Sequence, residues 1–301
     1  MPSSDKTDNT PLRELIKVLA PFIYVQTEEE GRFLRWLHTE YSGQKHHKIK
    51  VWKRTRGLFD IDTYIQGWTD LRAAAAPPDE SANINTAMMR ILGEQTPQDR
   101  YYYVLFDAET LLDGRDPMVT RRFMDQAEQV HMNRDCFKSI ILVSNQLVIP
   151  PKMNRMVRVA DFELPSDDLL TKNLTETLTS DHVVSKIKVD VPGVVSEMRG
   201  LTLHEADLIA IENLALRGGL TAAHVRQAKV DVIKKNPLLD LVTPNVRFDD
   251  IGGMDRLKDY LRKRRAAWTP EGKSYGLPPF RGVLVVGLPG NGKSLICKGL
   301  A

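Results

Sequence analysis

The sequence predicts an α/β protein with a mostly parallel sheet, followed by a small helical subdomain and the start of a second α/β module. Five short apolar runs alternate with helical patterns up to about residue 165. Strand signals are then absent up to about residue 235, and four helical patterns follow one another there. A glycine-rich loop follows a further apolar run near residue 290. Strands that alternate with helices favour a parallel sheet covered by helices.

The first α/β module is expected over residues 13–165, after a flexible tail at residues 1–12. Its predicted strands are residues 22–25, 48–53, 101–106, 139–143 and 156–164. Thr27 and Glu30 have the spacing of a capping box, which predicts a helix from there to Tyr41. Further helices are expected near residues 60–75 and 84–93 and at residues 117–133.

Residues 166–236 are expected to form the helical subdomain, with helices at 167–178, 192–199, 203–216 and 222–235. Thr202 and Glu205 make another capping box, and Gly218 and Gly219 close the helix that they begin. A linker is predicted at residues 237–247, where prolines interrupt the pattern. The second module is then expected over residues 248–301.

The composition of the 301 residues excludes several classes of protein. Hydrophobic residues make up 42% and charged residues 27%, which excludes a disordered or collagen-like chain. No run of 18 apolar residues predicts a membrane span, and residues 1–10 lack the apolar part of a secretory signal. The two cysteines, Cys136 and Cys297, favour a reducing compartment. The net charge is +3, which is no nucleic-acid footprint by itself.

Residues 287–294 match GxxxxGK[ST], the phosphate-binding P-loop. An apolar run at 282–286 precedes it as a predicted buried strand, and residues 295–301 can begin a helix. Glycines let the backbone N–H groups surround phosphate oxygens, and the helix start adds partial positive charge. Lys293 is the predicted catalytic residue because it can reach the β- and γ-phosphates, and Ser294 is the predicted Mg²⁺ ligand. The predicted ATP-binding residues of the loop are Gly287, Leu288, Pro289, Gly290, Asn291, Gly292, Lys293, Ser294 and Leu295.

Two neighbouring segments make the second module resemble the AAA class of P-loop ATPases. They are Phe-Asp-Asp-Ile-Gly-Gly at residues 248–253 and Tyr-Gly-Leu-Pro-Pro-Phe-Arg-Gly at residues 275–282. In AAA ATPases the residues at the positions of Ile251 and Gly252 flank the adenine. The resemblance therefore adds both residues to the predicted ATP site. Ile251 also suits an ordinary core position, and the two roles are compatible.

The first module resembles an AAA module without a P-loop. Residues 103–107 resemble the strand and aspartate of a Walker B motif, but Ala108 stands where a glutamate is expected and Glu109 follows one place later. Asn145 stands at the position of the sensor asparagine, and residues 162–165 resemble the exit into the family's helical lid. The first strand continues into Gln-Thr-Glu-Glu-Glu at residues 26–30, whose carboxylates would repel phosphate. We therefore expect no ATP binding by this module, and a capping or buried polar role for Asp107 and Glu109.

A degenerate AAA module joined to an intact P-loop, with Ile-Tyr-Val-Gln-Thr-Glu-Glu-Glu at residues 23–30, is similar to the "hypothetical chloroplast reading frame" AAA family of plastids, cyanobacteria and phages. The resemblance implies an ATP hydrolase that forms a homo-oligomeric ring and remodels a protein partner. It also implies a cytoplasmic setting: a bacterial cytoplasm, a plastid stroma or the cytoplasm of a phage-infected host.

Only seven residues follow Ser294, whereas the Walker B pair, sensor, arginine finger and lid of an AAA module lie downstream of its P-loop. We therefore expect a fragment that hydrolyses no ATP alone. A chain that supplies the rest of the second module is one expected partner.

Two other functions stay open at this point. The degenerate module could serve as a non-enzymatic interaction or regulatory scaffold. The basic run at residues 46–56 could instead face nucleic acid, with Trp52 stacking on a base. An edge strand protected by lysines is the favoured interpretation of this run, so nucleic acid is not favoured as a partner. Arg155 and Arg158 lie near the position of an arginine finger, but a surface role is favoured for both.

Overall fold

The computed structural model describes residues 9–67, 78–94, 96, 98–133, 135–179, 189–233, 251–265 and 267, and single positions beyond these. Those positions are 272, 274–276, 284, 286, 292, 293, 295 and 296. The chain divides into two compact units, residues 1–229 and residues 230–301. The predicted linker at residues 237–247 lies outside the described residues.

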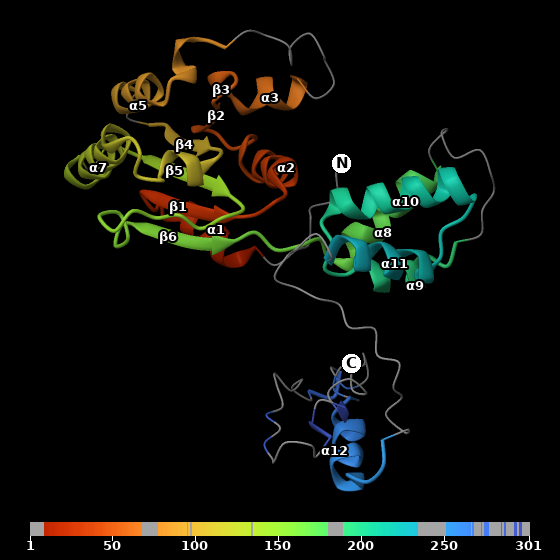
Figure 1. Cartoon of the computed structure of the whole chain (residues 1–301). Helices are drawn as coiled ribbons and strands as arrows, with labels where there is room; N and C mark the ends of the chain where they lie inside the picture. Colours follow the sequence, from red (N-terminus) through yellow and green to blue (C-terminus); the bar gives the residue numbers. More distant parts are fainter. Residues whose placement is uncertain are drawn as a thin grey trace. The chain divides into compact units, whose positions relative to one another are not determined.

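A six-stranded sheet forms the centre of the first unit (Figure 1). Its order is β3-β2-β4-β5-β1-β6, and all neighbours pair in parallel except β2 and β3. The predicted α/β class with a mostly parallel sheet is therefore confirmed. The strands are β1 (Phe22–Gln26), β2 (His47–Lys53), β3 (Gly57–Asp60), β4 (Arg100–Leu105), β5 (Lys138–Ser144) and β6 (Val157–Asp161).

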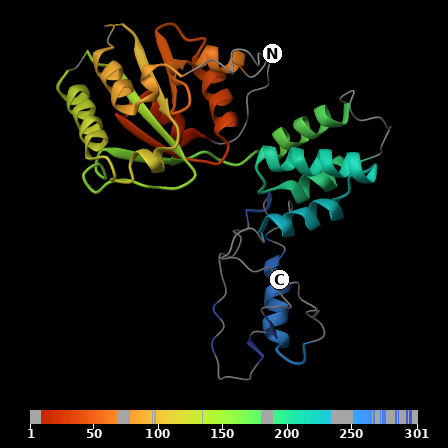
Figure 2. The same ribbon diagram turned by 45° about the horizontal axis from the view of Figure 1, so that its top comes forward.

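Helices cover both faces of the sheet, which lies between α2 and α7 in both ribbon views (Figures 1 and 2). Alternate residues of each strand point to opposite faces. Ile23 and Val25 therefore join the core under α1 (Thr10–Lys17), α2 (Glu30–Tyr41) and α3 (Ile61–Gly67). Phe22 and Tyr24 join the core under α5 (Ile84–Gly93) and α7 (Pro117–Met132). Two short elements, η1 (Glu80–Ala82) and α6 (Ala108–Leu111), lie in connections.

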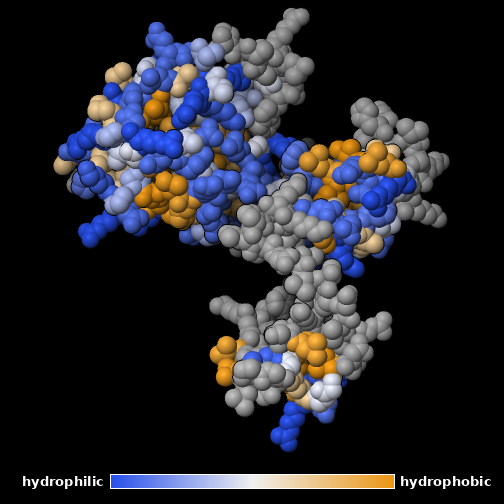
Figure 3. All heavy atoms as spheres, in the orientation of Figure 1, coloured by the Kyte–Doolittle hydropathy of each residue, from blue (hydrophilic) through white to orange (hydrophobic). Residues whose placement is uncertain are grey.

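The four helices predicted for the helical subdomain are all present, with a core of their own. Thr202 and Glu205 form the predicted capping box, and Gly218 ends the helix in the left-handed conformation with a φ of 62°. The helices are α8 (Asp167–Thr179), α9 (Val191–Met198), α10 (Leu203–Arg217) and α11 (Ala222–Ile233). The outer face of α10 exposes Leu208, Ile211 and Leu216, and apolar side chains gather on this subdomain in Figure 3.

The structure differs from the sequence prediction at the start of the first module. Helix α1 begins at Thr10 and buries Leu12 and Ile16, so residues 9–12 are no flexible tail, while residues 1–8 lie outside the described part. The capping box predicted at Thr27 and Glu30 is wrong. Thr27 Oγ1 accepts a hydrogen bond of 3.0 Å from the Glu29 N–H, and α2 begins at Glu30 with Glu29 as its N-cap.

The sequence prediction also missed β3, which pairs antiparallel with β2. Strand β2 therefore lies inside the sheet, and its interpretation as an edge strand is wrong. The helix predicted near residues 60–75 is described only as α3, because residues 68–77 lie outside the described part.

The hairpin between β2 and β3 depends on a glycine. Gly57 has a φ of +95°, where a side chain strains the backbone. An added Cβ would also lie 2.1 Å from Asp79 Oδ1 and 2.5 Å from Ser81 Oγ. The Ser81 hydroxyl accepts a hydrogen bond of 2.7 Å from the Leu58 N–H, so this close approach holds the hairpin to η1.

We expect Gly57→Ala to lower the free energy of unfolding by about 2–3 kcal/mol, because strain and a steric clash add. Gly114→Ala is the matched control, because Gly114 has a φ of +82° with no atom within 4 Å of an added Cβ. Gly114→Ala should lower the free energy of unfolding by about 1 kcal/mol, because only the backbone is strained. Urea unfolding measures both variants, and equal losses would contradict the role of the close approach.

Asp79 predicts a dependence of stability on pH. The hydrogen bond from the Ser81 hydroxyl, aided by Arg90 at 2.7 Å, holds the pKa of the Asp79 carboxyl below its ordinary value. The charged carboxylate therefore stabilises the fold above its unfolded pKa, and this stabilisation is lost as the pH falls through the folded pKa. In urea unfolding, the free energy of unfolding of the wild type should exceed that of Asp79→Asn, and this difference should shrink as the pH falls from about 6 to about 3. A difference that grows over this interval would contradict the assignment.

Candidate nucleotide-binding sites

The carboxyl ends of β1, β4 and β5 lie along one edge of the sheet, because these strands are parallel neighbours. The register pairs Gln26 with Ser144 and Leu105 with Leu142. Open parallel sheets bind their ligands beyond this edge. The first module would therefore hold a nucleotide here if it held one at all.

The connection from β1 to α2 at this edge has three residues and no glycine. Thr27 N–H donates a hydrogen bond of 2.9 Å to the Ser144 carbonyl, which keeps the chain against β5. Glu29 follows with a side chain that is 5% exposed. Its Oε2 pairs with Arg32 Nη2 at 2.6 Å, and its Oε1 accepts a hydrogen bond of 2.6 Å from the Leu203 N–H. A buried carboxylate thus stands at the start of the first helix after β1, with its partners inside the chain.

Two other polar side chains of this edge are also bonded within the protein. Glu109 Oε2 accepts a hydrogen bond of 2.5 Å from the Ser144 hydroxyl, and Gln26 Nε2 donates one of 3.1 Å to the Asn145 carbonyl. Asp107 is exposed, has a φ of 55° and makes no capping bond through its side chain to α6. Glu109 is half-buried and bonded to Ser144, so it is not the fully buried polar residue expected, and a side-chain cap by Asp107 is not observed.

The basic run on β2 is largely occupied by internal contacts. Lys50 pairs with Glu94, and Lys53 Nζ lies 3.3 Å from Glu30 Oε2. Trp52 is 1% exposed and donates a hydrogen bond of 2.7 Å from Nε1 to the Ser81 carbonyl. Trp52 therefore cannot stack on a base in this structure.

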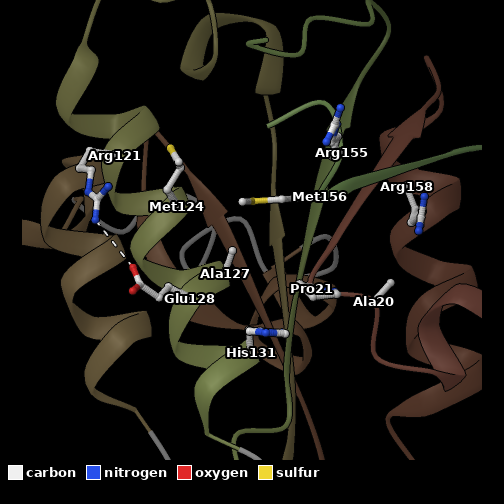
Figure 4. A pocket seen from close by; sticks show the side chains of 10 residues that line it. All are labelled: Ala20, Pro21, Arg121, Met124, Ala127, Glu128, His131, Arg155, Met156 and Arg158. Atoms are coloured by element: carbon white, nitrogen blue, oxygen red, sulfur yellow. Dashed lines mark ion pairs between the residues drawn. The ribbon is translucent and has the colours of Figure 1, made fainter. Parts of the chain in front are cut away.

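A cavity of about 490 Å³ lies between α7 and the amino ends of β1 and β6 (Figure 4). The connection at residues 145–156 contains no helix to cover this part of the sheet. The cavity is lined by Ala20, Pro21, Arg121, Met124, Ala127, Glu128, His131, Arg155, Met156 and Arg158. Arg121 pairs with Asp125 at 2.7 Å, whereas Arg155 and Arg158 form no ion pair with any described residue. Because the cavity opens at the amino ends of the strands, it is separate from the edge where nucleotides bind.

In the second unit, Met254, which precedes α12 (Asp255–Arg265), lies close to Gly292 of the predicted phosphate loop. Gly292 has a φ of +72°, and a Cβ added there would lie 3.6 Å from Met254 Cε. Ile251 is buried beside this segment, and its carbonyl accepts a hydrogen bond from Lys258 Nζ. Gly252 is exposed. The structure therefore brings Met254, which follows shortly after the two residues predicted to flank the adenine, next to the last glycine of the loop.

The helix predicted after the loop begins where expected. Ile296 N–H donates a hydrogen bond of 3.0 Å to the Gly292 carbonyl, and Lys293, Leu295 and Ile296 are helical. Leu295 is exposed. The other predicted site residues, Gly287, Leu288, Pro289, Gly290, Asn291 and Ser294, lie outside the described residues.

The buried strand predicted at residues 282–286 is not observed at the two positions that are described. Leu284 is 89% exposed and Val286 is 83% exposed, and neither belongs to a strand. A strand becomes buried only through pairing with neighbours and cover from helices. The described residues of this unit include no strand that could pair with it.

One functional contact was missed by the sequence analysis, the hydrogen bond between Glu29 and the Leu203 N–H. The two residues lie 174 positions apart, so no local pattern could predict the pair. The available signal was the run of three glutamates at the start of a helix, which indicated only that phosphate is disfavoured there.

Residues 8–162 match the family model described as "SpoVK-like AAA ATPase, N-terminal domain". The AAA domain-containing protein ycf46 of Trieres chinensis is 26% identical over 97% of this chain and 56% of its own length. A Bifidobacterium dentium protein named "AAA ATPase forming ring-shaped complexes" is 31% identical over 54% of this chain and 33% of its own length. The chain thus spans about half the length of the ycf46 relatives that it matches. The predicted resemblance to the chloroplast reading frame family is confirmed.

Among solved structures, the crystal structure of the FIGL-1 AAA domain in complex with ADP is 9% identical, with a TM-score of 0.46. The alignment of the two covers 89% of this chain and 90% of the FIGL-1 chain. Within the part of the chain that the structure describes, no helix is both long and apolar enough to cross a membrane.

Proposed function

Because the chain belongs to the SpoVK-like AAA ATPases, we propose that it is part of a machine that couples ATP hydrolysis to the remodelling of a protein partner. The second module binds ATP in this proposal, and the first module is a scaffold that binds none. The observation that carries it is the P-loop sequence at residues 287–294, whose Gly292 lies next to Met254, shortly after Ile251 and Gly252 in the sequence.

The residues present fit a triphosphate with Mg²⁺. A helix start with a glycine in the left-handed region exposes N–H groups that hold anionic oxygens. Lys293 adds a positive charge for the β- and γ-phosphates, and the Ser294 hydroxyl is an oxygen ligand of the kind that Mg²⁺ prefers. Mg²⁺ held by Ser294 would supply neutralisation of the negative charge on the phosphates, so that water could attack the γ-phosphorus in line with the leaving oxygen and release ADP and phosphate.

The geometry of the first module supports its role as a scaffold. The three-residue connection after β1 leaves no room for a phosphate loop, and the buried Glu29 carboxylate would repel an anion placed there. Glu109 and Gln26, which would otherwise face a nucleotide, are bonded within the sheet edge.

The oligomeric state and the cellular compartment of the protein are also proposed from its membership of the AAA ATPase family. The Bifidobacterium relative is named for ring-shaped complexes, and we extend a homo-oligomeric ring to this chain. The remainder of the second module, with its Walker B carboxylates and arginine finger, comes from residues beyond Ala301 or from a partner chain. The compartment is a bacterial cytoplasm, a plastid stroma or the cytoplasm of a phage-infected host.

The test is ATP hydrolysis by the protein extended past Ala301 to the length of its ycf46 relatives. Lys293→Ala should lower the turnover rate at least about 100-fold, because the γ-phosphate loses its main charge partner. Calorimetric titration of the extended wild type should show one ATP site per chain, and Lys293→Ala should show none. A site that remains in Lys293→Ala would contradict a first module without nucleotide.

A second candidate function is a regulatory scaffold without turnover. The cavity with Arg155 and Arg158 and the exposed apolar face of α10 favour it, because both are surfaces that a partner could cover. The same assay separates the two candidates. Absence of hydrolysis in both the extended wild type and its Lys293→Ala variant would favour the scaffold.

A further inference from the structure

Glu29 joins the starts of two helices that belong to different parts of the first unit. It is the N-cap residue of α2 in the α/β module, and it accepts the N–H of Leu203, the first residue of α10 in the helical subdomain. Helix starts carry unpaired N–H groups and partial positive charge, which favour an anion beside them. The buried carboxylate supplies this anion to α10 from within the chain.

Arg32 connects the same carboxylate to the segment that leads into the helical subdomain. Its Nε and Nη2 lie 2.8 Å and 2.6 Å from Glu29 Oε2. Nη2 also donates to the Glu163 carbonyl, and the guanidinium carbon lies 4.2 Å from the centre of the Phe162 ring. One ion pair on α2 therefore holds both the connection out of β6 and the start of α10.

The neighbouring glutamates do not share this arrangement. Glu28 is exposed, and Glu30 points to Lys53 on β2 at 3.3 Å. The run of three carboxylates thus contains one residue that is buried and bonded to the helical subdomain. The three glutamates therefore have different surroundings and do not form one acidic surface at the start of α2.

We propose that Glu29 is a built-in anion that locks the helical subdomain to the α/β module, at the position where a P-loop module holds phosphate. The first module then keeps one arrangement of these two parts, whether or not ATP is present. Glu29 and Arg32 act as positioning residues. This proposal rests on the geometry of the first module and does not depend on ATP binding by the second.

The energetic basis is the cost of breaking a buried charged network. Without the carboxylate, Arg32 loses its buried ion pair with Glu29, and the Leu203 N–H loses the Glu29 acceptor. Both losses are larger than those of a solvent-exposed ion pair, because water cannot replace the partner without opening the structure. Local opening at the start of α10 should therefore become more frequent.

Amide hydrogen exchange of the full chain tests the lock. In Glu29→Ala, the amides of residues 203–205 should exchange about 10-fold to 100-fold faster than in the wild type. Glu29→Gln keeps the size of the side chain and one acceptor, so an increase of about threefold to tenfold is expected. Glu28→Gln is the matched control and should leave these amides unchanged. The amides of β5 should stay protected in every variant, which reports an intact fold.

Unchanged exchange at residues 203–205 in Glu29→Ala, with β5 still protected, would overturn the proposal. Addition of Mg-ATP to the wild type must also leave residues 27–32 and 203–205 unchanged, and a change there would overturn it equally. Absence of ATP binding by the extended wild-type protein would instead count against the second module, and the results with the Glu29 variants would stand.

Discussion

The connection between β1 and α2 is the constraint on which the first module depends. β1 lies between β5 and β6, so its carboxyl end is fixed on both sides by strand pairing. The Thr27 N–H bond to Ser144 extends this restraint past the strand, and α2 begins three residues later. A loop that wraps around phosphates needs more residues and glycines. The three-residue connection from β1 to α2 is therefore too short for this sheet edge to hold a phosphate.

Closure of the rest of the edge follows from this constraint. With no ligand to occupy the space, the polar groups at the strand ends need partners within the protein, because unpaired buried groups are costly. Ser144 bonds Glu109, Gln26 bonds the Asn145 carbonyl, and Tyr24 Oη donates a hydrogen bond of 2.5 Å to the Gln146 carbonyl. These bonds take up groups that would face a nucleotide in an active module. The short connection after β1 and the internal bonds of the neighbouring polar groups thus both leave this edge without room for a nucleotide.

The sequence predicted most of the helices and strands because buried parallel strands appear as continuous apolar runs and capped helices have local signatures. It missed β3, whose four residues are too few for a periodic signal, and α1, whose Pro11 suggested a tail although proline is compatible with a first helical turn. The residues of the candidate site likewise include some with a local sequence signal and some without one. The phosphate loop is a local motif, whereas the Glu29 contact with Leu203 joins residues 174 positions apart. Only the folded chain brings such a pair together.

The two modules meet the same electrostatic need in opposite ways. A helix start presents N–H groups that favour an anion. In the proposed ATP site Gly292 offers a turn without a side chain, so the anion there comes from a ligand. Glu29, at the start of α2, instead brings its own carboxylate, which accepts the first N–H of α10. A permanent internal anion excludes an external one by occupancy and by repulsion. If ATP turns over in the second module, the first can therefore keep a constant shape through the cycle, which is the property required of a scaffold against which another module moves.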